Sequence, residues 1–224
     1  MIKIKFSVKN LLVVSALMCG LMFTNCGGGS GSGKKLASNE FLGDLPNLVY
    51  QNGFKDSVRN AKEDAEMNKL NPSKISDWEK GAKIKEKFKA QKEEAKKEFN
   101  AELEKLKPAI VGKDIPFEME EGLGYEIISF NVTEIDSYGS VRTNLEVKIT
   151  DPKEANLMRY ANALSVKLHE VDTDGNKIGY EREFNINLSG KTEGATGNYT
   201  YYVISFYPKD AVKYVNFDKI KFVK

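Results

Sequence analysis

YEIISFNVTEID (residues 125–136) and VRTNLEVKIT (residues 141–150) carry the clearest structural signal in this sequence. Apolar and polar residues alternate along both segments, with one interruption in the first, as expected for β-strands that bury one face and contain a bulge. The residues between them, Asp-Ser-Tyr-Gly at 136–139, favour a turn. The two segments therefore predict two strands joined by a tight turn.

Further segments of the C-terminal half show strand-like patterns between turn signals. About seven strands in roughly 110 residues are typical of an antiparallel β-sandwich, which we expect over residues 108–224. The Cys…Trp…Cys pattern of antibody domains is absent, so the expected class is an immunoglobulin-like sandwich. The strand pattern is similar to that of the small immunoglobulin-like modules of bacterial envelope proteins. The expected strands are Ile115–Glu120, Tyr125–Ile135, Val141–Thr150, Ala163–Val171, Lys177–Leu188, Tyr199–Tyr207 and Val215–Val223.

A helical pattern precedes the strands. Phe54, Val58, Ala61 and Ala65 fall on one face of a helix, and Pro72 follows its expected end. The first of the two expected helices therefore begins near residue 54.

A second, longer helix is expected over residues 76–107, where Ser76 and Glu79 have the spacing of a capping box. Two helices with one narrow apolar stripe each predict a helical hairpin over residues 54–107. Residues 36–53 are expected to form an irregular lead-in. The stripe of the second helix contains Trp78, Ala82, Phe88, Ala95, Phe99, Leu103 and Leu106.

Residues 1–25 have the features of an export signal. The first ten residues contain three lysines, and residues 1–25 contain no acidic residue. LLVVSALMCGLMF at residues 11–23 is an apolar run of 13 residues. A membrane-spanning helix needs about 20 apolar residues, so the run fits a signal-peptide core and is too short for a permanent anchor.

The segment Met22–Cys26 resembles a lipobox, the site where lipoprotein signal peptidase cuts, and GGGSGSG at residues 27–33 is a flexible tether by composition. Together these features resemble the lipoproteins of Bacteroidota. The resemblance implies cleavage before Cys26, acylation of its thiol with chains such as palmitate, and attachment to a membrane of the bacterial envelope. Cys19 is the alternative lipidation site.

The overall charge gives no indication of nucleic-acid binding. The chain has 34 basic and 32 acidic residues, and loss of Lys3, Lys5 and Lys9 with the signal segment leaves 31 against 32, a net charge of −1. Cys26 is then the one remaining cysteine, so no disulfide is expected.

An aromatic-rich region near the C-terminus is the best candidate for a binding face. Tyr199, Tyr201, Tyr202 and Tyr207 are candidate partner-binding residues, because exposed aromatic side chains on a sheet stack on sugars or contact proteins. Strand alternation sends about half of the aromatic residues inward, so core packing is the competing interpretation.

A second candidate site is a calcium loop. Asp172, Asp174, Asn176 and Glu183 have the ligand spacing of an EF-hand. However, Lys177 stands where that loop needs glycine, and the flanking segments are strand-like, so the sequence favours a hairpin turn without a metal.

Two other groups of polar residues have a simpler interpretation. His169 is the only histidine and cannot form a zinc site without further ligands. An acidic cluster could in principle supply paired catalytic carboxylates, but its alternation with apolar residues favours a solvated strand face. The cluster contains Glu118, Glu120, Glu121 and Glu126.

These features predict an α+β protein with four parts: a signal peptide (1–25), a lipidated cysteine with tether and lead-in (26–53), a helical hairpin (54–107) and a β-sandwich (108–224). We expect a non-enzymatic, membrane-anchored envelope lipoprotein of the outer membrane, without a cofactor, with a structural or partner-binding role. A carbohydrate-binding accessory lipoprotein is the alternative, and a hydrolase with an unrecognised site is a third. Because lysines follow the tether, the sequence leaves both the periplasmic and the surface face open.

Overall fold

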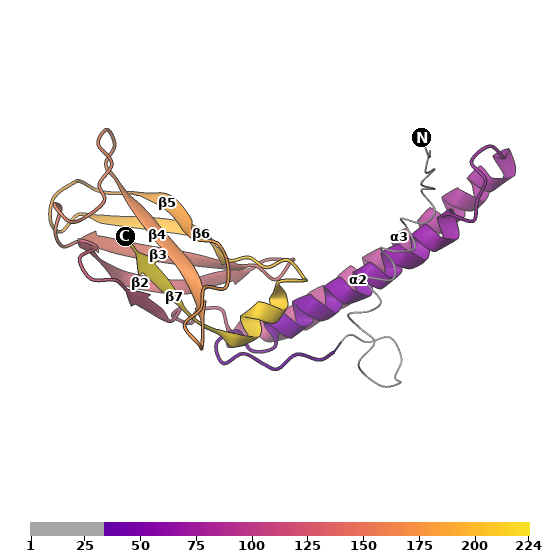
Figure 1. Ribbon diagram of the computed structural model, residues 1–224, viewed down its shortest axis with the longest axis horizontal. Coiled ribbons are helices and arrows are strands. Elements are labelled where there is room, and N and C mark those ends of the chain that lie inside the picture. The colour runs from indigo at the N-terminus through magenta and orange to yellow at the C-terminus, as the bar shows by residue number, and fades with distance from the viewer. Residues whose placement is uncertain (1–33) are drawn as a thin grey trace, which may run out of the picture. The chain divides into compact units, whose positions relative to one another are not determined.

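The computed structural model describes residues 34–224 (Figure 1), so Cys26, the tether and the signal segment lie outside the described residues. The described chain is α+β, as expected: helices come first and strands in two sheets follow. The elements are α2 (Leu45–Met67), α3 (Ile75–Leu106), the 3-10 helix η1 (Lys107–Ala109), β1 (Phe117–Met119), β2 (Tyr125–Ile135), β3 (Val141–Ile149), β4 (Ala163–Asp172), β5 (Arg182–Asn187), β6 (Thr196–Ile204), the 3-10 helix η2 (Ala211–Asn216) and β7 (Phe217–Val223).

The strands are arranged in one sheet of order β1-β7-β4-β5 and another of order β2-β3-β6. Neighbouring strands are antiparallel except β1 and β7, which are parallel, with Phe117 opposite Ile220. The expectation of a wholly antiparallel arrangement is therefore wrong at β1. A parallel pair needs a long crossover connection, and here the chain between β1 and β7 supplies it.

Strand β2 has the bounds that its alternation predicts, but its register with β3 shifts twice. One shift lies between Ile127 and Ser129 and the other between Val132 and Glu134. The sequence predicted a single interruption. Such bulges bend a strand and increase its local twist.

The buried faces of the two sheets contribute to one hydrophobic core. Leu145 and Ile149 of β3 and Leu164 and Leu168 of β4 are fully buried in it. Each such side chain stabilises the fold by about 1.5–3 kcal/mol relative to exposure. The next inward position of β4 holds Glu170, which is also fully buried.

Helix α2 begins at Leu45, earlier than Phe54, so the prediction that the lead-in remains irregular as far as residue 53 is wrong. Leu45 is buried in the core, and a Cβ on Gly53 would lie 2.0 Å from Cβ of Pro208. The first turns of α2 are thus fixed by contacts with residues distant in sequence, which local periodicity does not reveal.

Helix α3 begins at Ile75 with Lys74 as its N-cap residue, and the predicted capping box is wrong, because no side chain among residues 34–224 caps this N-terminus. Asp77 instead accepts hydrogen bonds from the backbone N–H of Asn71, at 3.0 Å, and from Nζ of Lys80, at 2.8 Å. The turn before α3 is therefore held by a carboxylate inside the helix, and Ser76 is not its cap.

Helices α2 and α3 contact each other and run in opposite directions. Nζ of Lys87 lies 2.8 Å from Glu66, and Nζ of Lys92 lies 2.7 Å from Glu63, so positions rise along one helix as they fall along the other. Each exposed pair contributes only about 0.2–1 kcal/mol, so these pairs fix register more than they add stability.

Only one end of this helix pair joins the main core. Leu45 of α2 and Phe99 and Leu103 of α3 belong to it, whereas Phe88 is buried outside it. Within residues 34–224, no helix combines the length and the apolar character that crossing a bilayer requires.

Candidate functional site

The four candidate tyrosines do not form one surface. Tyr199 and Tyr201 of β6 are half-buried, and both rings lie 4.5 Å, centroid to centroid, from that of Phe184 on β5. Tyr202 is 38% exposed and Tyr207, beyond the end of β6, is 73% exposed. The alternation along β6 therefore assigns the first two rings to packing between the edge strands and leaves Tyr207 the most accessible.

The Oη of Tyr201 is buried and has no hydrogen-bond partner among residues 34–224. Burial raises the pKa of the Tyr201 hydroxyl above its usual value. A neutral, packed phenol suits the core edge between β5 and β6, and it does not suit a group that meets a ligand.

Tyr207 lines a cleft of about 460 Å³ that we call the tyrosine cleft. Three separate parts of the chain form it: the segment between β4 and β5 with the start of β5, the segment after β6, and η2. Its lining residues are Ile178, Gly179, Tyr180, Arg182, Ser205, Tyr207, Lys209, Asp210, Lys213 and Tyr214.

Arg182 and the buried Glu170 form the base of this region. Nη2 of Arg182 lies 2.7 Å from Oε1 of Glu170, which makes a salt bridge, although neither carboxylate oxygen has a partner in hydrogen-bond geometry in the described part of the chain. Nη1 of Arg182 also donates to the carbonyl oxygens of Tyr202, at 3.0 Å, and Val203, at 2.5 Å. Arg182 thereby ties β5 to both β4 and β6.

Burial raises the pKa of the Glu170 carboxyl above its ordinary value, and the neighbouring charge of Arg182 acts in the opposite direction. A Cβ on Gly179 would lie 2.9 Å from Oε2 of Glu170. A glycine at this position therefore leaves room for the carboxylate beneath the cleft.

The rim of the tyrosine cleft is aromatic and basic. Tyr180 and Tyr207 both line the cleft and are 89% and 73% exposed. Nζ of Lys213 lies 3.3 Å from Asp210, whereas Lys209 has no salt-bridge partner among residues 34–224. With Glu170 offsetting Arg182 and Asp210 offsetting Lys213, one positive charge remains for a ligand.

Sequence reasoning missed Tyr180, Arg182 and Lys209, because they come from segments that only the tertiary structure brings together. One signal was available for the base of the cleft. The clean alternation of β4 through Leu168 places Glu170 on the inward face, and a buried carboxylate requires a cationic partner.

The proposed calcium loop is a turn. Oδ1 of Asp172 accepts hydrogen bonds from the backbone N–H groups of Asp174, at 3.0 Å, and Asn176, at 2.7 Å. Gly175 has φ of +83°, and Glu183 accepts a hydrogen bond from a serine of β4. These backbone donors hold the pKa of Asp172 below its usual range. No cluster of three or more His, Cys, Asp or Glu residues suited to a metal exists within residues 34–224.

The acidic cluster is spread over separate ion pairs. Glu118 lies 2.7 Å from Lys219, and Glu126 lies 2.9 Å from Lys148. Glu120 and Glu121 have partly or fully exposed side chains, as a solvated face requires. The pKa of His169 is lowered, chiefly by burial, and the ring lies on the face of β4 opposite the core.

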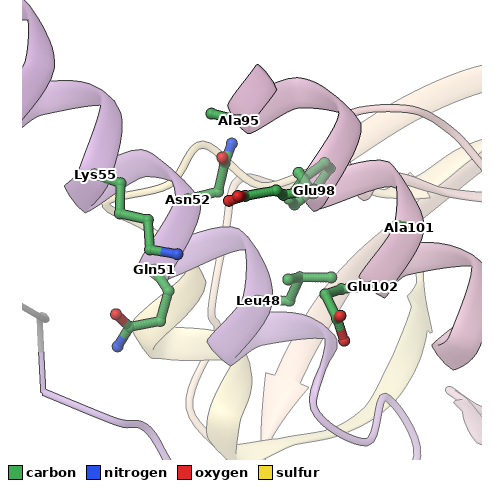
Figure 2. Close-up of a pocket in the computed structure, with 9 residues that line it drawn as sticks. Leu48, Gln51, Asn52, Lys55, Ala95, Glu98, Ala101 and Glu102 are labelled. Carbon is green, nitrogen blue, oxygen red and sulfur yellow. The ribbon is translucent and has the colours of Figure 1, made fainter. Parts of the chain in front are cut away.

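Figure 2 shows a hollow between α2 and α3 with a volume of about 450 Å³. The side chains of Asn52, Lys55 and Glu98 surround it, and the small side chain of Ala95 leaves space beside them. The lining combines groups of both charges, Lys55, Glu98 and Glu102, with apolar side chains such as Leu48 and Phe99. The hollow therefore resembles a solvated groove between helices more than a reactive site.

The turn between α2 and α3 exposes large apolar side chains. We call residues 67–78 the helical tip. Ile75 is 76% exposed and Trp78 is 64% exposed, although Trp78 belongs to the apolar stripe expected for the second helix. Nε1 of Trp78 donates to the carbonyl oxygen of Pro72 at 2.8 Å, which fixes the indole ring. An adjoining hollow of about 630 Å³ is lined in part by Met67 and Leu70.

Comparison with protein-family models, with curated proteins and with solved structures gave no match to this chain.

Proposed function

We propose that the protein is a lipoprotein of the bacterial envelope that is acylated at Cys26, has no enzymatic activity and binds a partner through its helical tip. The signal-like segment, the lipobox-like Met22–Cys26 and the Gly/Ser tether support the anchor. In this proposal the described part is a helical hairpin followed by an immunoglobulin-like sandwich.

The observation that carries partner binding is the ordered exposure of Ile75 and Trp78. Ile75 is 76% and Trp78 64% exposed, and Trp78 adjoins a hollow lined in part by Met67 and Leu70; neighbouring exposed apolar side chains of this kind mark interaction surfaces. The hydrogen bonds of Trp78 and Asp77 to the turn fix the tip before binding, which lowers the entropic cost of association. Tryptophan is also enriched among the residues that dominate binding energy at interfaces.

The reach of the tip supports the same role. Eight residue-to-residue steps separate Cys26 from Lys34 and extend at most about 28 Å, and α2, with 23 residues, is about 35 Å long. An acyl anchor on Cys26 would therefore allow the tip to meet a partner well beyond the lipid headgroups, either in the periplasm or at the cell surface.

The anchor is tested by metabolic labelling with a palmitate analogue in the native host. Cys26→Ser should abolish the label and release the chain from the membrane fraction, whereas Cys19→Ser should keep both. Normal labelling of the Cys26→Ser variant would refute the assignment.

The tip is tested by photo-crosslinking of the native lipidated protein in cells, with the crosslinker placed at Ser76. A discrete adduct is expected, and Trp78→Ala should remove it. Tyr160→Ala is the matched control, because Tyr160 is 88% exposed and lies in the segment before β4. Adducts that are diffuse, or unchanged by Trp78→Ala, would contradict the proposal.

A further inference from the structure

We propose that the tyrosine cleft is a binding site for an acidic saccharide, a sugar carrying a carboxylate, sulfate or phosphate group. No residue that lines the cleft belongs to the helical tip or to the proposed anchor, so the inference does not depend on the function proposed above. It extends the carbohydrate-binding alternative from Tyr207 to Tyr180, Arg182 and Lys209, which the sequence did not single out.

The size and shape of the cleft fit a small ligand. Its volume of about 460 Å³ lies within the roughly 300–1,000 Å³ of typical small-molecule sites. Tyr180 and Tyr207 stand on its rim with 89% and 73% of their surface exposed. A rigid aromatic ring that is left in water beside a cleft offers a flat apolar face and a polar hydroxyl, the combination that sugar rings require.

Close contacts fix the groups at the base of the cleft. Glu170 is fully buried, its ion pair with Arg182 is 2.7 Å long, and Gly179 leaves space for the carboxylate. Arginine has five N–H donors, and the contacts to Glu170 and to two backbone carbonyls leave donors on Arg182 for a ligand. The Glu170 carboxylate therefore acts as a positioning group, which holds the guanidinium at the cleft.

The charge of the cleft points to an anionic ligand. Arg182, Lys209 and Lys213 face it, whereas the acids are Asp210 at its wall and Glu170 beneath it. Asp210 is engaged with Lys213, and Lys209 has no acidic partner within residues 34–224. One uncompensated cation beside two exposed rings matches an acidic sugar better than a neutral one.

The test uses the full-length protein in non-ionic detergent and isothermal titration with tetragalacturonate and with a hyaluronan tetrasaccharide. Methyl-esterified tetragalacturonate is the matched probe, because esterification removes the charge and keeps the rings. Binding of at least one acidic probe is expected, with weaker binding of the ester and of both probes at high salt.

Tyr207→Ala and Tyr180→Ala should each weaken acidic-probe binding by roughly three- to tenfold. Lys209→Gln should weaken binding of the charged probe and leave the ester unchanged. The matched controls are Tyr160→Ala and Lys153→Gln, two exposed residues outside the cleft that should not change affinity. Circular dichroism of each variant shows that the fold is retained.

Three outcomes would overturn the inference. One is the absence of binding by both acidic probes. Another is binding that the cleft variants do not change. The third is binding of inorganic phosphate or of phosphatidylglycerol vesicles through the same residues while the saccharides remain silent, which would assign the cleft to free phosphate or to lipid headgroups.

Discussion

Removal of the Arg182 side chain should destabilise the protein more than removal of the charge on Glu170. In Arg182→Ala the fully buried carboxylate of Glu170 loses its cation, and two backbone carbonyls lose their donor. Breaking a buried pair from one side costs about 3–5 kcal/mol. Glu170→Gln replaces the carboxylate with an uncharged side chain of similar size and leaves Arg182 bound to the carbonyls. Because the Arg182 side chain is 26% exposed, we expect a loss of about 1–2 kcal/mol in the free energy of unfolding.

The effect should depend on pH with a defined sign. Burial raises the pKa of Glu170, and loss of Arg182, which acts to lower it, raises it further. An acid whose pKa is raised by folding binds more protons in the folded state, so stability falls as pH rises through that range. The destabilisation caused by Arg182→Ala should therefore be largest near neutral pH. It should become smaller as the pH falls toward the ordinary pKa of a carboxyl group.

The measurement is urea unfolding followed by circular dichroism at about pH 7.5 and about pH 5. Glu170→Leu combined with Arg182→Leu should be more stable than Arg182→Ala, because no buried charge is left unpaired. Lys87→Ala, which removes a cation from an exposed pair with Glu66, is the control and should cost less than about 1 kcal/mol. Equal losses in Arg182→Ala and Lys87→Ala, or a loss that grows as pH falls, would refute this reasoning.

Three further outcomes follow from the packing. Gly53→Val should destabilise the protein by about 1–3 kcal/mol in urea unfolding, since a Cβ there would meet Pro208 at 2.0 Å, and an unchanged midpoint would place the α2–Pro208 contact in error. Phe99→Ala should cost about 3–5 kcal/mol, whereas Trp78→Ala should cost less than about 0.5 kcal/mol, because Phe99 is 6% and Trp78 64% exposed; the reverse order would contradict the assignment of the core. Asp172→Ala should lower the melting temperature at neutral pH, where the carboxylate is ionised and accepts backbone hydrogen bonds. Because the pKa of Asp172 is lowered by folding, the stability that it gives is lost as pH falls, so the difference between variant and wild type should vanish in strong acid. A difference that persists in acid would argue against the turn.

The strands were the part of the fold that local sequence could predict. The expected bounds of Tyr125–Ile135 agree with β2, and those of β3 and β4 differ by one residue at one end. In a strand that buries one face, apolar and polar residues alternate with a period of two, so this alternation alone locates the strand in the sequence. The parallel pairing of β1 with β7 was not predictable in this way, because strand pairing joins residues about 100 positions apart.

The helices show where periodicity fails. The start of α2 depends on the burial of Leu45 and the close approach of Gly53 to Pro208, and neither is a local property. The position of Trp78 on the apolar stripe predicted burial, yet the tip extends beyond the core and the ring is exposed. A stripe shows which face of a helix is apolar, and it does not show how far along the helix a partner element reaches.

By itself, the amino-acid sequence determined the α+β order of the chain and the inward face of each well-alternating strand. The prediction of an export signal in residues 1–25 rests on the sequence alone, because these residues lie outside the described part of the chain. The tertiary structure alone decided which tyrosine side chains are packed and which are exposed to solvent. It also brought Tyr180, Arg182 and Lys209 to one cleft. The physical reason is that side-chain period is set by the local backbone, whereas a cleft is set by the packing of segments whose contacts leave no local pattern.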